Sequence, residues 1–380
     1  MKDKIRIAFV VTNCKRTGPI NQTWNIIRYM DRNKFEPLLV TMFEENENNT
    51  MIDCYYELGI DVYCAGLNKV QSILYGKKRI SKLLERIKVD IVQGIGMPPY
   101  RMTLGYNSAV HFLTLRNYCY EDYPDQYGKF IGRPLAFLDM QKIKKQIKKG
   151  ATFVTCSKSL TKIYKEKENI DIDYIRNGVD VSKYYKRSKE THINAKKNLN
   201  LPLDKTIFVY SGRMIERKNQ KEAIEGFLKS EVSKNSILLL LGDGEMLEYL
   251  KEEYKLYSNI LFKGNVSNIQ EYIHASDYYI SSSKSEGLPN GVLEAMAVGL
   301  PVILSNIPQH LEFFEINCNI GVSYELGNIE MLAKKIEKIT NEKWDNLSKE
   351  AYDTVINNLT AEVMSKNYQS LYEILIHNGV

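Results

Sequence analysis

Residues 285–299 read Ser-Glu-Gly-Leu-Pro-Asn-Gly-Val-Leu-Glu-Ala-Met-Ala-Val-Gly, a polar loop that runs into an apolar helix. Pro289 suits the first turn of a helix, because no amide donor is missed there. Free amides at a helix start, together with the partial positive charge of that end, favour a bound phosphate. Glu286 on the loop and Glu294 in the helix place a carboxylate on either side of such an anion. The stretch therefore predicts a site for a sugar joined to a phosphate.

The spacing of the two glutamates resembles the Glu-x7-Glu signature of glycosyltransferase family 4, a family of retaining enzymes with the GT-B fold. Two helical glutamates alone are common, but four further matches follow the family's order along the chain. They are Asn177-Gly178-Val179-Asp180, the turn from Tyr210 to Gln220, Gly242-Asp243-Gly244, and Phe262-Lys263-Gly264-Asn265-Val266. The resemblance covers residues 150–310 well and the rest of the chain more loosely.

The resemblance implies a role for each matching residue. Glu286 is expected to hold sugar hydroxyls, Glu294 the ribose hydroxyls, and Arg213 and Lys218 the donor diphosphate. Backbone at 263–265 is expected to contact the base. The donor-binding residues expected in full are Gly18, Gly212, Arg213, Lys218, Gly264, Asn265, Val266, Glu286, Gly287, Leu288, Pro289, Asn290 and Glu294. The residues expected to act in catalysis are Glu286, Arg213, Lys218 and Arg116.

Arg213 and Lys218 have an alternative interpretation as ordinary solvated cations at a helix start. Their position favours a functional role, because they follow the apolar run 206–210 at its carboxyl end, where open α/β sheets bind ligands. Cations near a helix N-terminus are also locally unfavourable unless an anion is present.

Two positions depart from the family pattern. Gly18 stands in the family's glycine-rich turn, but Pro19 replaces the second glycine and removes an amide donor. Arg116 stands in Thr114-Leu115-Arg116-Asn117, where many members have a histidine facing the transferred sugar. Three roles for Arg116 remain open: binding a charged acceptor, adding a cation near the diphosphate, or pairing with Glu121 or Asp122. Arg-Asn variants followed by a segment like 118–124 resemble bacterial envelope polysaccharide enzymes.

Buried-strand runs alternate with helical patterns in two series, which predicts two doubly wound α/β domains. The first series has strands near 5–11, 36–42, 60–64, 90–93, 109–115, 151–155 and 172–175. The second has strands near 206–211, 236–241, 259–263, 278–281, 301–304 and 320–322. We expect an acceptor-binding Rossmann-like domain over 1–181, a linker over 182–204, a donor-binding Rossmann-like domain over 205–360, and a helix over 361–380 that returns to the first domain. Ligands are expected in a cleft between the domains.

Composition is that of a globular protein. The 380 residues exceed one ordinary domain, and 52 Lys plus Arg against 46 Asp plus Glu give a net charge of +6, too mild to require nucleic acid. The six cysteines show no metal-ligand spacing, which favours a reducing cytoplasm. The apolar run 5–11 is too short for a signal peptide or a membrane span.

No cofactor is expected, because the nucleotide sugar is a co-substrate and the cations near the diphosphate can stabilise the departing oxygens without metal. Asp171-Ile172-Asp173 looks like a metal-binding motif but lies in a strand, so we expect it to be ordinary.

A membrane surface is a further candidate partner. Residues 135–149 place Met140, Ile143 and Ile147 on one helical face, with lysines over 142–149 around it. Such a helix either rests on anionic lipid at the inner face of the cell membrane or packs into the protein with a solvated lysine fringe.

Three functions of different classes are compatible with these patterns. The first is a retaining transferase that moves a hexose or N-acetylhexosamine from a nucleotide sugar, with UDP the expected carrier, to a glycan or polyprenyl-linked glycan of the cell envelope. The second is a nucleotide-sugar-binding partner subunit that has lost activity, and the third is a GT-B nucleotide-sugar epimerase. Intact Glu286, Glu294, Arg213 and Lys218 favour turnover over binding alone, and their order favours the transferase.

Overall fold

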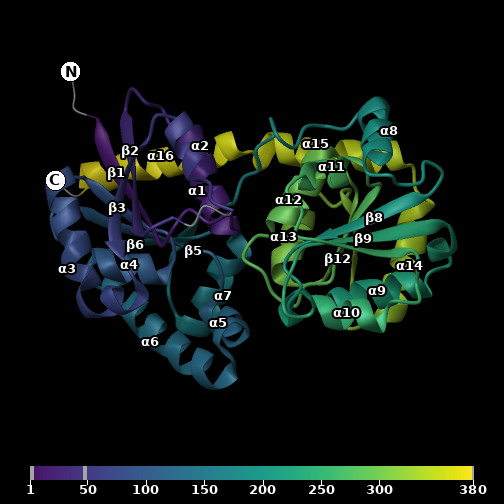
Figure 1. Ribbon diagram of the computed structural model, residues 1–380, viewed down its shortest axis with the longest axis horizontal. Coiled ribbons are helices and arrows are strands. Elements are labelled where there is room, and N and C mark those ends of the chain that lie inside the picture. The colour runs from purple at the N-terminus through teal and green to yellow at the C-terminus, as the bar shows by residue number, and fades with distance from the viewer. Residues whose placement is uncertain (1–3, 46–48, 379–380) are drawn as a thin grey trace. The chain divides into compact units, whose positions relative to one another are not determined.

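The structure is a computed structural model that describes residues 4–45 and 49–378. The chain divides into two compact units (Figure 1). Unit 1 comprises Met1–Gly178 with Ala361–Val380, and unit 2 comprises Val179–Thr360. Each unit contains its own parallel sheet, so the predicted α/β architecture with two Rossmann-like domains is confirmed.

Unit 1 is built on a seven-stranded sheet of order β3-β2-β1-β4-β5-β6-β7. Its strands are β1 (Ile5–Val11), β2 (Phe35–Phe43), β3 (Asp61–Leu67), β4 (Ile91–Gly94), β5 (Val110–Leu115), β6 (Thr152–Thr155) and β7 (Asp173–Tyr174). Alternate residues of β1 enter two separate cores, with Phe9 in one and Val10 in the other. Both faces of this sheet are therefore covered, which explains why its strands are apolar without alternation.

The helices of unit 1 include one from the far end of the chain. They are α1 (Gly18–Arg28), α2 (Ile52–Glu57), α3 (Lys69–Ile87), α4 (Met97–Thr103), α5 (Cys119–Tyr127), α6 (Lys129–Ile147), α7 (Lys158–Glu168) and α16 (Ala361–Asn378). The Ser365 hydroxyl donates to the Ile26 carbonyl at 2.7 Å, and the hydroxyls of Tyr368 and Thr114 lie 2.8 Å apart. The predicted return of the last helix to the first domain is thus confirmed.

Unit 2 contains a six-stranded parallel sheet of order β10-β9-β8-β11-β12-β13. Its strands are β8 (Thr206–Ser211), β9 (Ser236–Leu241), β10 (Ile260–Gly264), β11 (Tyr278–Ser281), β12 (Val302–Ser305) and β13 (Gly321–Tyr324). All six residues of β9 are buried, as expected of a central strand covered on both faces. The order reverses between β8 and β11, which creates a topological switch point at that edge of the sheet.

The remaining elements belong to unit 2, including one helix where we expected a linker. They are α8 (Lys189–Asn198), η1 (Glu216–Lys218), α9 (Gln220–Lys229), η2 (Glu231–Asn235), α10 (Leu247–Glu253), α11 (Ile269–His274), α12 (Asn290–Val298), α13 (Pro308–Ile316), α14 (Ile329–Thr340) and α15 (Trp344–Asn358). Ser188 and Thr191 form a capping box at the start of α8. Arg187 pairs with Asp277 at 3.3 Å, so residues 182–204 are tied to unit 2 rather than free.

The predicted helix 135–149 is the second half of α6. Met140 and Ile143 are buried in unit 1, so the apolar face that we considered for lipid binding packs inside the protein. Within the described ranges, no helix has both the length and the apolar character needed to cross a bilayer.

Candidate functional site at the carboxyl edge of the second sheet

The donor-binding residues expected in unit 2 all follow the carboxyl ends of three strands. Gly212, Arg213 and Lys218 follow β8, Gly264 ends β10 with Asn265 and Val266 after it, and residues 286–294 follow β11. Parallel strands end at the same edge of a sheet, which is where such folds bind ligands. The fold therefore brings these segments to one edge.

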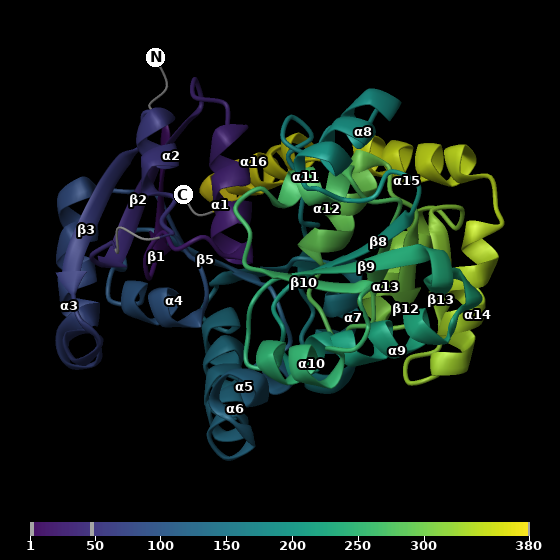
Figure 2. The same ribbon diagram turned by 45° about the vertical axis from the view of Figure 1, so that its right-hand side comes forward.

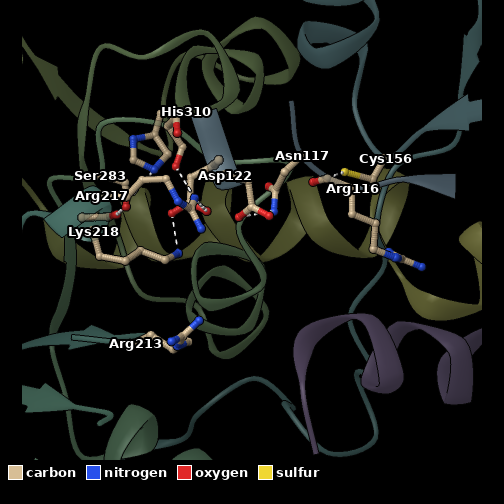
Figure 3. A network of polar contacts seen from close by, with 12 residues as sticks. Arg116, Asn117, Asp122, Cys156, Arg213, Arg217, Lys218, Ser283 and His310 are labelled. Carbon is tan, nitrogen blue, oxygen red and sulfur yellow. Dashed lines mark hydrogen bonds and ion pairs between the residues drawn. The ribbon is translucent and has the colours of Figure 1, made fainter. Parts of the chain in front are cut away.

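Glu286 is the centre of a buried ion-pair cluster. The side chain is 6% exposed, and Oε1 lies 2.5 Å from Lys218 Nζ. Oε2 lies 3.6 Å from Arg217 Nη1, which also donates to the Ser285 carbonyl at 2.6 Å. Burial alone would raise the pKa of Glu286, but the charges of Lys218 and Arg217 lower it to about 2. Glu286 is therefore a fixed carboxylate that orients two cations, Lys218 and Arg217, which are labelled in Figure 3.

A buried polar network holds Lys218 and the loop after β11 in place. The Tyr210 hydroxyl at the end of β8 donates to the Lys218 carbonyl at 2.5 Å and lies 3.0 Å from the Ser283 hydroxyl. Ser305 at the end of β12 donates to the Ser283 carbonyl at 2.8 Å and lies 2.9 Å from His310 Nδ1. Burial lowers the pKa of His310 to about 4, so this histidine is neutral at physiological pH. The cluster is thus held by neutral hydrogen bonds to three strand ends.

The loops after β8 and β9 approach each other so closely that glycine is required. A Cβ on Gly242 would lie 2.0 Å from the Gly212 carbonyl oxygen, and Gly242 has a φ of +135°. A Cβ on Gly291 would lie 2.3 Å from the Tyr279 hydroxyl. These glycines let the backbone at the sheet edge and the first turn of α12 pack without a gap.

Helix α12 presents its N-terminus and Glu294 at this edge. The helix begins at Asn290, one residue later than expected, and Pro289 occupies the cap position without a side-chain hydrogen bond to the helix. The N-terminus of a helix carries a partial positive charge, which favours a nearby anion. Burial raises the pKa of the partly exposed Glu294 to about 7, and the Lys183 charge and a Tyr184 hydrogen bond offset part of that rise. Unlike Glu286, Glu294 titrates near neutral pH.

Arg213 differs from the cations around Glu286. Its side chain is exposed, and among the described residues it has no hydrogen-bond or ion-pair partner. Figure 3 shows it apart from Lys218, Arg217 and His310. A guanidinium with five free donors, at the same sheet edge as Lys218 and Arg217, is suited to bind a phosphate group.

The two site residues expected in the first domain lie in unit 1. Gly18 is the first residue of α1, and Pro19 follows it in the first turn. Arg116 follows β5 and donates to Asn177 Oδ1 at 2.8 Å. Glu121 pairs instead with Lys167 at 3.0 Å, and Figure 3 shows the Arg116 guanidinium turned away from Asp122. The pairing of Arg116 with Glu121 or Asp122 was therefore a wrong alternative.

Unit 1 also contains a cavity of about 330 Å³ at the ends of β1, β4 and β5. Thr12 and Arg116 line it from the strand ends and Pro19 from the first turn of α1, and the helices α5 and α6 contribute Asp122 and Asp139 among others. Asp139 is buried and accepts a hydrogen bond from the Tyr123 hydroxyl at 2.7 Å. This cavity is a mixed polar and apolar pocket on the sheet edge of unit 1.

Sequence reasoning missed Arg217 and His310. Arg217 is adjacent to Lys218, but only the fold shows that it faces Glu286 rather than solvent. His310 lies two residues into α13, directly after the β12 end, and the rule that ligands bind at strand ends could have drawn attention to it.

Comparison with known proteins shows a family similarity for the part of the chain that contains this edge. Residues 192–358 match the family model "Glycosyl transferases group 1". The chain is 28% identical over 220 residues to an Escherichia coli protein named UDP-Gal:alpha-D-GlcNAc-diphosphoundecaprenol alpha-1,3-galactosyltransferase, a match that spans 54% of this chain and 55% of the relative. It is also 24% identical over 394 residues to the O-antigen biosynthesis glycosyltransferase WclY of Escherichia coli, with 98% of this chain and 99% of the relative covered.

A solved structure with the same two-unit architecture is HepE of Anabaena in complex with UDP-glucose. It has a TM-score of 0.79 and 14% identity, and the match covers 98% of this chain and all of that one (100%). Likeness at this identity shows the fold, and the fold is GT-B, as predicted from the sequence. Residues 192–358 of this chain are therefore similar to the glycosyl transferases group 1 family, and the chain has the GT-B fold.

Proposed function

We propose that this protein is a retaining glycosyltransferase that moves a hexose or N-acetylhexosamine from a UDP-sugar to a glycan or lipid-linked glycan of the bacterial cell envelope. The observation that carries the proposal is the cluster of Glu286, Lys218 and Arg217 at the carboxyl edge of the second sheet, an edge that also carries the free Arg213. The donor carrier and acceptor class are supported by relatives, one named for UDP-Gal and a diphosphoundecaprenol acceptor and another for O-antigen biosynthesis.

The donor diphosphate is proposed to lie against Arg213, Lys218 and the start of α12. Breaking the bond between the anomeric carbon and the diphosphate leaves negative charge on the departing oxygens. Cations and helix amides fixed in advance stabilise that charge most as the bond breaks, which is how they accelerate the reaction. No metal is assigned a role in this scheme.

The two carboxylates are proposed to bind different parts of the donor, Glu286 the transferred sugar and Glu294 the ribose. Glu286, charged at every physiological pH, accepts hydrogen bonds from sugar hydroxyls and keeps Lys218 beside the phosphate. Glu294 accepts from the ribose hydroxyls when it is ionised, and residues 264–266 contact the base. In unit 1, Arg116 and the cavity that it lines are proposed to bind the acceptor.

The proposal is tested by incubating the purified protein with UDP-, GDP- and ADP-linked sugars in the presence of EDTA and measuring release of nucleotide and sugar. We expect slow hydrolysis of one UDP-sugar, with the α-anomer as the first sugar product by NMR. Release of the β-anomer from an α-linked donor would contradict retention, and activity that EDTA abolishes would contradict the metal-free scheme.

The alternative of a partner subunit without activity predicts a different pattern in the same assay. It predicts that a UDP-sugar stabilises the protein against thermal unfolding but that no sugar is released with any acceptor. The epimerase alternative predicts a change of sugar configuration without an acceptor. The intact cation and carboxylate set favours the transferase over both.

A further inference from the structure

The helical hairpin α5–α6 of unit 1 exposes an apolar patch that the proposed reaction does not use. Phe130 at the start of α6 is 97% exposed. Four neighbours in sequence are each between two-fifths and two-thirds exposed: Tyr127, Ile131, Phe137 and Leu138. We name these five residues the hairpin patch. Large apolar side chains gathered on one exposed element mark an interaction surface.

The hairpin holds this patch outward. Every buried residue of α6 lies on the opposite face, with Ala136, Met140 and Ile143 packed inward. Gly132 packs directly on α5, because a Cβ there would lie 2.5 Å from the Tyr123 carbonyl carbon. The two helices are therefore tightly joined, and α5 does not cover the patch. Figure 2 shows the hairpin extending beyond the sheet of its unit.

The exposed charged residues of α6 all have one sign. The exposed cations of α6 and the turn after it are Lys129, Arg133, Lys145, Lys148 and Lys149. None of them has an ion-pair partner among the described residues. The acidic residue of α6, Asp139, is buried and bound by Arg101 at 3.4 Å. The outward face thus presents apolar side chains followed by unpaired cations, with no α6 carboxylate on it.

The hairpin patch adjoins the cavity of unit 1 that is proposed to bind the acceptor. Tyr127 belongs to the hairpin patch and also lines the cavity of about 330 Å³, together with Asp122, Gln126 and Ile143 from the same hairpin. A surface that received the patch would therefore lie beside the mouth of that cavity.

We propose that the hairpin patch docks onto the surface of an anionic lipid bilayer, with Phe130 and Ile131 entering the acyl boundary and the lysines of α6 contacting headgroups. Apolar residues flanked by unpaired cations are the combination that binds this surface. The docking itself needs no substrate. Only the corollary, that a membrane-held acceptor enters the adjacent cavity, rests on the proposed function.

The docking is tested by flotation of the full chain with vesicles of phosphatidylglycerol and of phosphatidylcholine, without any nucleotide sugar. We expect binding to the anionic vesicles that high salt weakens, and binding to phosphatidylcholine at least about tenfold weaker. Phe130→Asp with Ile131→Asp should weaken binding by about tenfold or more. The matched control is Leu256→Asp with Tyr257→Asp, which replaces exposed apolar residues of unit 2 and should leave binding unchanged.

The charge contribution has its own pair of variants. Lys145→Glu with Lys148→Glu should weaken binding to anionic vesicles and reduce its salt dependence, whereas Lys189→Glu with Lys334→Glu should change neither. All four positions are exposed in the structure, so circular dichroism and thermal melting should match the wild type.

Three outcomes would overturn the proposal. The first is wild-type protein that stays unbound with anionic vesicles, and the second is a Phe130→Asp, Ile131→Asp variant that binds as well as wild type. The third is a wild-type dimer by light scattering that this variant converts to a monomer, which would make the patch an interface between two copies. UDP-sugar hydrolysis without vesicles should be the same in all variants, so loss of docking and loss of the proposed activity are distinguishable.

Discussion

The carboxyl edges of the two sheets differ in the charge and polarity of the side chains that they carry. The edge of unit 2 has a charged cluster whose carboxylate is fixed by two cations, with neutral serine, tyrosine and histidine groups behind it. The edge of unit 1 has a cavity with mixed lining and one arginine tied to an asparagine. A fixed charge pattern suits a ligand part that never changes, such as a diphosphate. A mixed cavity suits a ligand that differs between relatives, such as an acceptor.

The largest expected effect comes from removing the fixed charge of unit 2. Glu286→Gln keeps the shape of the side chain but no longer fixes Lys218 and Arg217, and it weakens the contact to sugar hydroxyls. We expect donor hydrolysis to fall by about 100-fold or more. The control is Glu248→Gln, which removes an exposed carboxylate paired with Lys251 in the same unit and should leave the rate unchanged. An unaltered rate in Glu286→Gln would remove this residue from the site.

A second prediction concerns stability. Lys218→Met leaves the Glu286 carboxylate buried with only Arg217 beside it, and breaking a buried pair in this way costs about 3 kcal/mol or more. Adding Glu286→Gln should restore much of that loss, because no unpaired charge remains. Urea unfolding measures the difference, and Lys251→Met at the exposed pair should cost less than about 1 kcal/mol. Equal losses at both pairs would show that the cluster is not effectively buried.

The third prediction separates the free cation from the fixed ones. Arg213→Ala should weaken binding of UDP by about tenfold, since a charge-assisted contact to phosphate is lost, without changing the melting temperature of the empty protein. Lys334→Ala, at an exposed cation without a partner in the described part of unit 2, serves as the control. Calorimetry checks both, and unchanged affinity in Arg213→Ala would place the phosphates elsewhere.

A fourth prediction tests whether the contrast between units is functional. Arg116→Ala in unit 1 should raise the KM for the acceptor and leave donor hydrolysis within about twofold of wild type. Arg116→Lys should recover part of the loss if the charge matters. A large fall in donor hydrolysis would instead assign Arg116 to the donor phosphates. It would contradict the assignment of the acceptor to unit 1 and the donor to unit 2.

The smallest effect is a pH dependence from Glu294. With a pKa of about 7, its ionised fraction rises from roughly 10% at pH 6 to roughly 90% at pH 8. Only the carboxylate accepts from both ribose hydroxyls, so UDP-sugar affinity should rise several-fold over this range with release of a proton. Calorimetry in two buffers checks this, and Glu294→Gln should remove the dependence. In the free protein the sign is opposite: stability contributed by the raised pKa is present below the ordinary value and is lost as pH rises through about 7.

The sequence predicted the strands, their two series and the return of the last helix, because apolar runs and polar turns carry that information locally. It also predicted Glu286 and Lys218, although not that they would contact each other. Arg217 and His310 were missed because their roles depend on segments far away in sequence, at Glu286 and at Ser305 with Ser281. Helix α8 was predicted to be a linker because its sequence is rich in lysine and asparagine, which is typical of linkers, although it forms a short capped helix. Both alternatives for the apolar face of α6 stayed open in the sequence, because periodicity shows that one face is apolar but not what covers it; the structure shows that Met140 and Ile143 pack inside the protein.

The most direct test of the central claim, that the edge of unit 2 binds a nucleotide diphosphate, is calorimetric titration of UDP into the full chain in EDTA. We expect one UDP-binding site per chain, with affinity at least about tenfold weaker in Arg213→Ala and unchanged in Lys334→Ala. The absence of UDP binding, or equal affinity in all three proteins, would contradict it.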